Sequence, residues 1–164
     1  MSPDLFKGGM RRLAAGVSLI TTNDGGIRHG LVATAVSSVS AEPPTLLVCI
    51  NRNASAHDPI RAAGIICVNV LSDRQRPLAD VFSSSVDRDR RFDHGTWRTL
   101  KTGAPALSGS EASFDCEIRQ VVTYHSHSLF LSEIVGVELW SETLSPLIYL
   151  DGSYRLVGSP SVAA

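Results

Sequence analysis

The sequence contains few cysteines, no excess charge of either sign and no long apolar run, and each shortage excludes a class of protein. Its three cysteines are odd in number, far apart and set in apolar segments, which indicates buried reduced thiols and not a disulfide framework. Fifteen Lys and Arg against 16 Asp and Glu give a net charge of −1, without the basic field that attracts nucleic acid. Apolar stretches reach about five residues, where a bilayer span needs roughly 20. The N-terminus lacks the apolar centre of a signal peptide, so we expect a cytoplasmic protein that contacts neither membrane nor nucleic acid.

Motifs of several common chemistries are also missing. The chain has no GxGxxG that opens a helix after a strand, no GxxxxGK[ST] and no GxSxG. His125 and His127 are two residues apart, which in a strand places them on one face, so they could form a metal pair or simply a polar sheet face. No CxxC or HExxH accompanies them, and we predict no metal site.

The length of 164 residues predicts a single domain, residues 1–164, with a core that needs no disulfide or metal. Hydrophobic periodicity predicts roughly six or seven strands at hairpin spacing with short helices, which is typical of an antiparallel barrel or sandwich. We expect a helix from Pro3 to Ala15, turns at Asn23–Gly26 and Asp151–Gly152, one long strand run from Ile27 to Ser40, and an irregular connection from Leu100 to Ser110.

Ser55 begins a segment with the rhythm of a capping box, in which Asp58 stands where Glu or Gln is usual. Pro59 is tolerated in the first turn of a helix, and Gly64 ends the predicted helix after Ala63. Unpaired N–H groups at a helix N-terminus favour an anion. Ser55 is therefore predicted either as a plain N-cap or as part of an anion site.

Several segments in chain order form a recognisable set: MRRLAAGVSLITT, SSVS-x-x-PP-TLLVCINR-x-x-S, ICVNVLS, the Arg90-Arg91-Phe92 turn, GAPAL, HSLFLSEIVGV and LIYLDGSYR. Together they resemble the short-chain flavin reductases, the small reductase components of two-component flavin monooxygenases. The likeness covers nearly the whole chain, and its specificity comes from the order and spacing of the segments. It implies a mainly β, antiparallel, Greek-key-like split β-barrel (an FMN-binding split barrel) with short peripheral helices. It also implies noncovalent FMN or FAD, NADH or NADPH as donor, and a homodimer.

The small residues from Val32 to Ala35 would let a flat ring approach the strand closely, or would merely fit the interior of a small barrel. The resemblance implies that Thr34 and Ala35 lie against the pyrimidine edge of the flavin. It implies further cofactor contacts from Val32, Ala33, Ser37, Ser38, Cys49, Ile50 and Asn51, with the serines near the ribityl chain or phosphate and Asn51 toward the ribityl hydroxyls. Without the resemblance, the serines could be turn hydroxyls, and Cys49 is expected to pack and not to act as a redox thiol.

The resemblance assigns the remaining candidates as well. Ser55 would share its helix end with the flavin phosphate, Arg91 and Phe92 would lie near the cofactor, and Tyr154 would border the pocket. His127 would face the nicotinamide side as the catalytic residue. The alternatives are a solvated charged loop for Arg91 and Phe92, a structural strand histidine, and packing at the barrel end for Tyr154. His125-Ser126 and Ser132 depart from residues common in the family, which leaves the electron acceptor less certain than the flavin.

The predicted function is NAD(P)H:flavin oxidoreduction, with hydride transfer to bound FMN or FAD and onward to a second acceptor, free flavin for a partner monooxygenase. Such transfer needs the two rings stacked within roughly 3.5 Å, and the protein mainly positions them. One alternative acceptor is a cobalt corrinoid, as in a cob(II)yrinic acid a,c-diamide reductase of cobalamin biosynthesis, and another is a ferric complex. A non-catalytic flavin-binding module is the third possibility. Because the chain is too small for a separate nicotinamide domain, both ligands should share one barrel surface, completed by a second copy.

Overall fold

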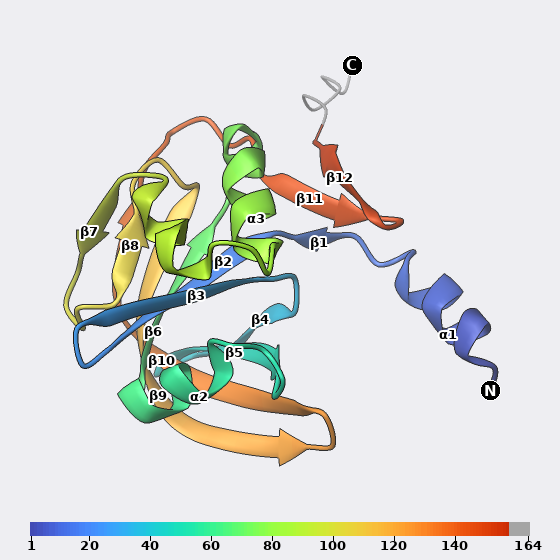
Figure 1. Cartoon of the computed structure of the whole chain (residues 1–164), viewed down its shortest axis with the longest axis horizontal. Coiled ribbons are helices and arrows are strands. Elements are labelled where there is room, and N and C mark those ends of the chain that lie inside the picture. The colour runs from blue at the N-terminus through green and yellow to red at the C-terminus, as the bar shows by residue number, and fades with distance from the viewer. Residues whose placement is uncertain (158–164) are drawn as a thin grey trace.

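The computed structural model describes residues 1–157 and is built around a seven-stranded antiparallel sheet in the order β3-β2-β6-β9-β10-β5-β4 (Figure 1). Its strands are β2 (Ser18–Asp24), β3 (Ile27–Ala33), β4 (Val36–Ala41), β5 (Pro44–Asn51), β6 (Ile65–Val70), β9 (Ala112–Tyr124) and β10 (His127–Leu139). A second sheet joins β1 (Ala15–Gly16), β11 (Leu147–Leu150) and β12 (Ser153–Leu156), and β7 (Trp97–Thr99) pairs with β8 (Pro105–Leu107). The expected mainly β, antiparallel class is confirmed. Residues 158–164 of the expected single domain lie outside the described residues.

Short helices lie around the sheet, as expected. They are α1 (Pro3–Met10), α2 (His57–Ala63) and α3 (Arg76–Ser83), with 3₁₀ turns η1 (Asp73–Gln75) and η2 (Arg88–Asp93). In Figure 1, α3 lies above β3, and α1 projects away from the sheet next to the N-terminus. The α2 helix packs against β2 and β6. No helix within residues 1–157 is long and apolar enough to span a membrane.

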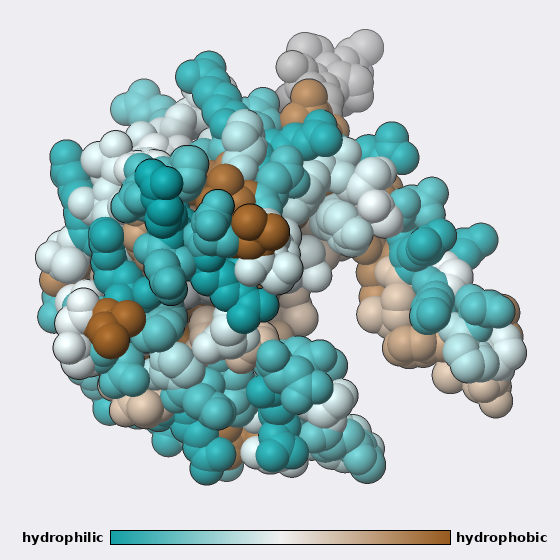
Figure 2. Space-filling view, viewed as in Figure 1, coloured by the Kyte–Doolittle hydropathy of each residue, from teal (hydrophilic) through white to brown (hydrophobic). Residues whose placement is uncertain are grey.

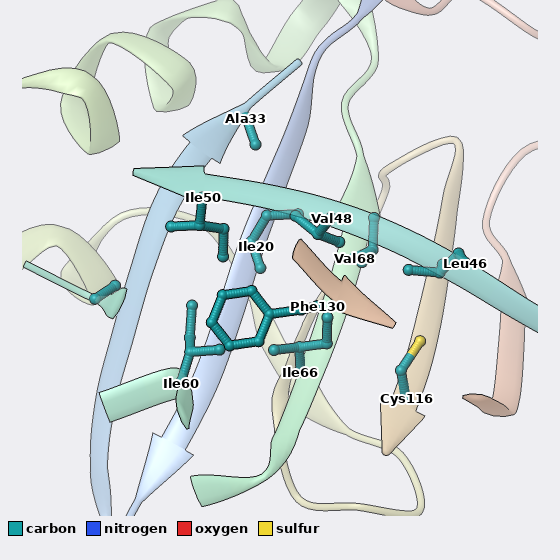
Figure 3. Packing of buried hydrophobic residues seen from close by; sticks show 11 residues of the cluster. Ile20, Ala33, Leu46, Val48, Ile50, Ile60, Ile66, Val68, Cys116 and Phe130 are labelled. Carbon is teal, nitrogen blue, oxygen red and sulfur yellow. The ribbon is translucent and has the colours of Figure 1, made fainter. Parts of the chain in front are cut away.

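The core fills the inside of the curved sheet because each strand turns alternate side chains inward. In β5, Leu46, Val48 and Ile50 are buried while their neighbours are partly exposed. Figure 3 shows Ile60 of α2 and Phe130 of β10 together in this core, and neither has exposed surface. The α2 helix therefore closes one end of the barrel and fixes the segment that precedes it.

The long strand run expected from Ile27 to Ser40 is two strands with a bend at Thr34 and Ala35. Strand β3 pairs with β2, whereas β4 pairs with β5 at the other edge of the sheet. The carbonyl of Ala35 accepts from the N–H of Cys49 at 3.0 Å, which attaches the bend to β5. Small and β-branched residues favour a strand along the whole run, and the choice of partner strand decides where it breaks. The bend marks the place where the barrel splits.

Three further expectations were wrong in detail. The first helix ends at Met10, before Ala15, because Ala15 and Gly16 pair with β11 instead. The connection from 100 to 110 contains β8. His125 lies in the turn between β9 and β10 with a φ of +50°, so it does not share a strand face with His127.

Candidate functional site

A cleft of about 580 Å³ lies along the start of β3 and brings together three segments that are distant in the sequence. Its lining residues are Gly26, Ile27, Arg28, His29, Gly30, Ser55, Ala56, Arg88, Asp89, Arg91 and Phe92. The lining contains three arginines and one acidic residue, so we call this cleft the arginine cleft. Such an arrangement attracts anions, and guanidinium groups match the geometry of phosphate oxygens.

Arg91 is the most buried of these arginines, with 7% of its surface exposed. Its Nη1 donates to the carbonyl of Gly30 at 3.3 Å and its Nη2 donates to the carbonyl of Ser84, but its buried Nε has no protein partner. Burial, and then the charge of Arg88, lower the pKa of Arg91 below its usual value. An anion in the cleft would relieve this repulsion between the two guanidinium groups.

Phe92 connects the charged turn to the hydrophobic core. It is 8% exposed and packs edge-to-face on Phe82, with the ring centroids 5.2 Å apart. The guanidinium carbon of Arg28 lies 4.8 Å from the Phe92 ring centre, in a cation–π arrangement. The segment from 87 to 92 is therefore not a freely solvated loop at its C-terminal end.

The structure places Ser55 on the cleft wall but contradicts its predicted role as N-cap. The cap of α2 is Ala56, which makes no side-chain capping bond, and the helix has only seven residues. A preceding turn, in which the N–H of His57 donates to the carbonyl of Ala54, brings Ala56 into αR geometry and shifts the helix start past Ser55. The attraction for an anion at this place therefore rests on the arginines and not on the helix end.

The bend at Thr34 separates two further hollows. One, of about 510 Å³, includes Thr34 and Ala35 and lies between α1 and the β11–β12 hairpin. The other, of about 530 Å³, includes Val32, Thr34 and Tyr154 and lies beside α3. Thr34, Tyr149 and Gly152 line both hollows. Figure 2 shows the open space between the body and α1. The structure thus brings together Val32, Thr34, Ala35 and Tyr154.

The other predicted residues lie at the ends or edges of strands. Ala33 and Ile50 turn their side chains into the core, so side-chain contact with a cofactor is excluded and only their backbone could serve. Ser37 and Ser38 are exposed on the edge strand β4. Cys49, which is half-buried, is bonded through its backbone to the bend at Ala35.

Asn51 and His127 are register partners at the adjacent ends of β5 and β10. The Asn51 side chain accepts from the N–H of Asn53 at 2.9 Å and shapes the following turn. His127 is half-buried, and its Nδ1 lies 2.9 Å from Oγ of Ser126. Within residues 1–157, no group of three or more His, Cys, Asp or Glu could hold a metal ion.

Sequence reasoning missed Arg28, His29 and Arg88 as cleft residues. Arg88 was visible in the charged run that contains Arg91, but the run alone does not say which side chains face inward. Arg28 and His29 carry no motif, and they join the cleft only because the β2–β3 hairpin lies beside η2.

The structure therefore combines an antiparallel barrel that opens at the β3–β4 bend, hollows on both sides of that bend and, at the start of β3, a cleft lined by three arginines. Residues 10–158 match the model of the family described as flavin reductase like domain, and the chain belongs to this family.

Individual relatives agree with this assignment. A protein of Bradyrhizobium diazoefficiens named FMN reductase (NADH) RutF is 39% identical over 158 residues, which cover 96% of this chain and 87% of the relative. The solved structure of the flavin reductase PheA2 superposes with a TM-score of 0.88 at 29% identity, covering 97% of this chain and 100% of the other. BorF, the flavin reductase component of a bacterial two-component tryptophan halogenase, gives a TM-score of 0.88 at 28% identity over 96% of this chain and 99% of its own.

Proposed function

We propose that this protein is a flavin reductase that binds FMN noncovalently and uses NADH as electron donor. The observation that carries the proposal is the arginine cleft at the start of β3, in a chain of this family whose β3 leads at its other end to the hollows at Thr34. The preference for FMN and NADH is supported by the names of the relatives. FAD and NADPH serve as comparison ligands in the tests.

The residues present fit this cofactor. Arg88 and Arg91, with Ser55, line the cleft and would hold the phosphate. The backbone at Thr34 and Ala35 leaves room for the ring, and Asn51 would meet the ribityl hydroxyls. His127 would orient the nicotinamide. FMN, when bound, supplies the ring that accepts hydride from NADH.

A second copy of the chain is part of the proposal because residues 1–157 leave α1 largely uncovered. None of its residues is buried, and Leu5, Phe6 and Met10 are 71%, 53% and 50% exposed. A helix of eight residues is marginal in water unless its apolar face is covered. In Figure 2, apolar residues of α1 gather on the side that faces the hollow near Thr34. A homodimer would cover this helix and complete the walls of the site.

We further propose that the reduced flavin leaves the site for a partner monooxygenase. The name of the neighbour BorF, a reductase component, supports this use. Three free cysteines, two of them buried, fit a reducing compartment such as the cytoplasm. Anaerobic reduction by NADH, followed by an acceptor screen, tests the proposal. It fails if NADH does not bleach the flavin-loaded protein, or if free FMN does not accelerate NADH oxidation while a cobalt corrinoid or ferric complex does.

Ser55→Asp is predicted to weaken FMN binding several-fold or more, because a carboxylate on the cleft wall repels the phosphate and competes for the arginines. A fluorescence titration with FMN measures the effect. Ser141→Asp, at an exposed serine of the β10–β11 connection, is the matched control. Unchanged affinity in Ser55→Asp would remove this serine from the phosphate site.

His127→Ala is predicted to slow flavin reduction by NADH with little loss of FMN affinity, because the side chain lies at the strand end and away from the arginines. Anaerobic stopped-flow absorbance measures the rate, with His94→Ala at an exposed histidine as control. Equal rates in wild type and His127→Ala would make the histidine structural.

A further inference from the structure

His57 is a buried histidine that the proposed reaction does not use. It is the first residue of α2, and 3% of its surface is exposed. Its Nε2 lies 2.9 Å from Oγ of Ser128, and its Nδ1 lies 2.7 Å from Oδ1 of Asp58. The ring also meets Phe130 at 5.6 Å in an edge-to-face arrangement. Both ring nitrogens are engaged, so the ring has one fixed orientation.

The partners of the ring determine the direction of these hydrogen bonds. A carboxylate can only accept, so in the neutral ring Nδ1 carries the proton and donates to Asp58. Nε2 then accepts from the hydroxyl of Ser128. Because Ser128 is 1% exposed, water would not replace this hydroxyl if it were removed, and Nε2 would be left without a partner.

The two bonded residues belong to the two segments that carry the proposed site. Directly before His57, Ser55 and Ala56 form part of the wall of the arginine cleft. Directly before Ser128 stands His127, at the start of β10. The hydrogen bond between His57 and Ser128 therefore links the cleft wall to the strand that presents His127.

The loop from 51 to 56 is attached to the β9–β10 hairpin at both ends. At its start, the N–H of Arg52 donates to the carbonyl of Ser126 at 2.9 Å. Inside the loop, Asn51 accepts from Asn53 and Ala54, and the small side chains of Ala54 and Ala56 pack against the core. At its far end, the His57–Ser128 bond makes the second attachment.

We propose that His57 is a positioning residue of the flavin site. Through Ser128, it holds the loop that contains Ser55 in a fixed relation to His127. The inference rests on the proposed function, which assigns the phosphate to Ser55 and the nicotinamide side to His127. Without the bond, the free protein spends time with the loop displaced, and FMN binding must restore its position at a cost in affinity.

Three variants test this role. Ser128→Ala and His57→Asn remove the bond, because the amide of Asn reaches the position of Nδ1 but not that of Nε2. His57→Gln can still reach Ser128 and should rescue most of the affinity. We expect roughly tenfold weaker FMN binding in the first two variants, the order of effect of one buried hydrogen bond. We also expect faster amide hydrogen exchange in residues 52–55 of the FMN-free protein.

Ser113→Ala is the matched control. Its hydroxyl is also fully buried, donates to Oδ1 of Asn69 at 2.8 Å and accepts from Nε1 of Trp140 at 3.0 Å, and it lies at the start of β9, away from the turn between β9 and β10. Because it loses more hydrogen bonds, Ser113→Ala should lower the stability to urea at least as much as Ser128→Ala while FMN affinity stays unchanged. If Ser113→Ala weakens FMN equally, or Ser128→Ala leaves FMN affinity and loop exchange unchanged, the proposal is overturned.

The exchange measurement separates this proposal from the proposed function. If the wild-type chain binds no FMN, the proposed function fails. In that case, faster exchange confined to 52–55 in Ser128→Ala still supports His57 as the residue that positions the loop, and unchanged exchange overturns it. If His57→Asn does not fold, Ser128→Ala alone decides the outcome.

Discussion

Replacement of Gly30 by alanine tests whether the arginine cleft depends on close packing behind β3. A Cβ at this position would lie 2.8 Å from Cε1 of Phe82 and 3.2 Å from the carbonyl oxygen of Ile20. Phe82 cannot easily move, since it is 2% exposed and packs against Phe92 and Trp97 at 5.2 and 5.9 Å. Overpacking of this kind costs about 1–3 kcal/mol.

The change from glycine to alanine also has a stabilising effect, but this effect is no larger than the smallest overpacking cost, so the variant should lose stability. Alanine restricts the unfolded chain and thereby stabilises the protein by about 0.4–1 kcal/mol. The difference between these two effects is a net loss of about 0–2.6 kcal/mol in the free energy of unfolding, centred near about 1.3 kcal/mol. Because the Gly30 carbonyl accepts from Arg91, the displaced strand should also weaken FMN binding.

Urea unfolding followed by tryptophan fluorescence, together with an FMN titration, measures both consequences. Gly16→Ala is the control, because a Cβ there meets nothing within 4 Å. Gly16→Ala should be as stable as the wild type or slightly more stable. If Gly30→Ala also matches the wild type in stability and FMN affinity, the packing argument for the cleft is refuted.

Two other predictions concern the thiols and the oligomer. Burial, and then the charge of Asp115, raise the pKa of Cys116 to about 12 and that of Cys67 still further. Because the folded pKa exceeds the unfolded one, stability is fully present below about pH 8.5 and falls as the pH rises toward 12, by about 1.36 kcal/mol per pH unit for each thiol. The urea midpoint of Cys116→Ala should therefore fall less steeply with rising pH than that of the wild type. Equal slopes in the two proteins would contradict the raised pKa of Cys116. Phe6→Asp should turn a dimer into a monomer in light scattering, with Asp4→Asn as control, whereas a monomeric wild type would contradict the proposed role of α1.

Local chemistry in the sequence determined much of the fold. The turns Asn23–Gly26 and Asp151–Gly152 form hairpins as predicted, because glycines there adopt the positive φ that such turns require. Alternation of apolar residues in β5 gave the buried face correctly, since side chains alternate with a period of two. The sequence motifs identified the family, because their order and spacing along the chain can be read without knowledge of the tertiary contacts.

Only the tertiary structure decided which segments meet. The break at Thr34 follows from β3 and β4 pairing at opposite edges of the sheet, a choice that strand propensity does not encode. The cap of α2 moved from Ser55 to Ala56 because a preceding turn took up the residues that the pattern assigned to the helix. Arg28 joins Arg91 in the cleft because a hairpin and a 3₁₀ turn distant in the sequence pack side by side. The sequence by itself determined the class and the family, and long-range packing alone determined where the positive charge of the site gathers.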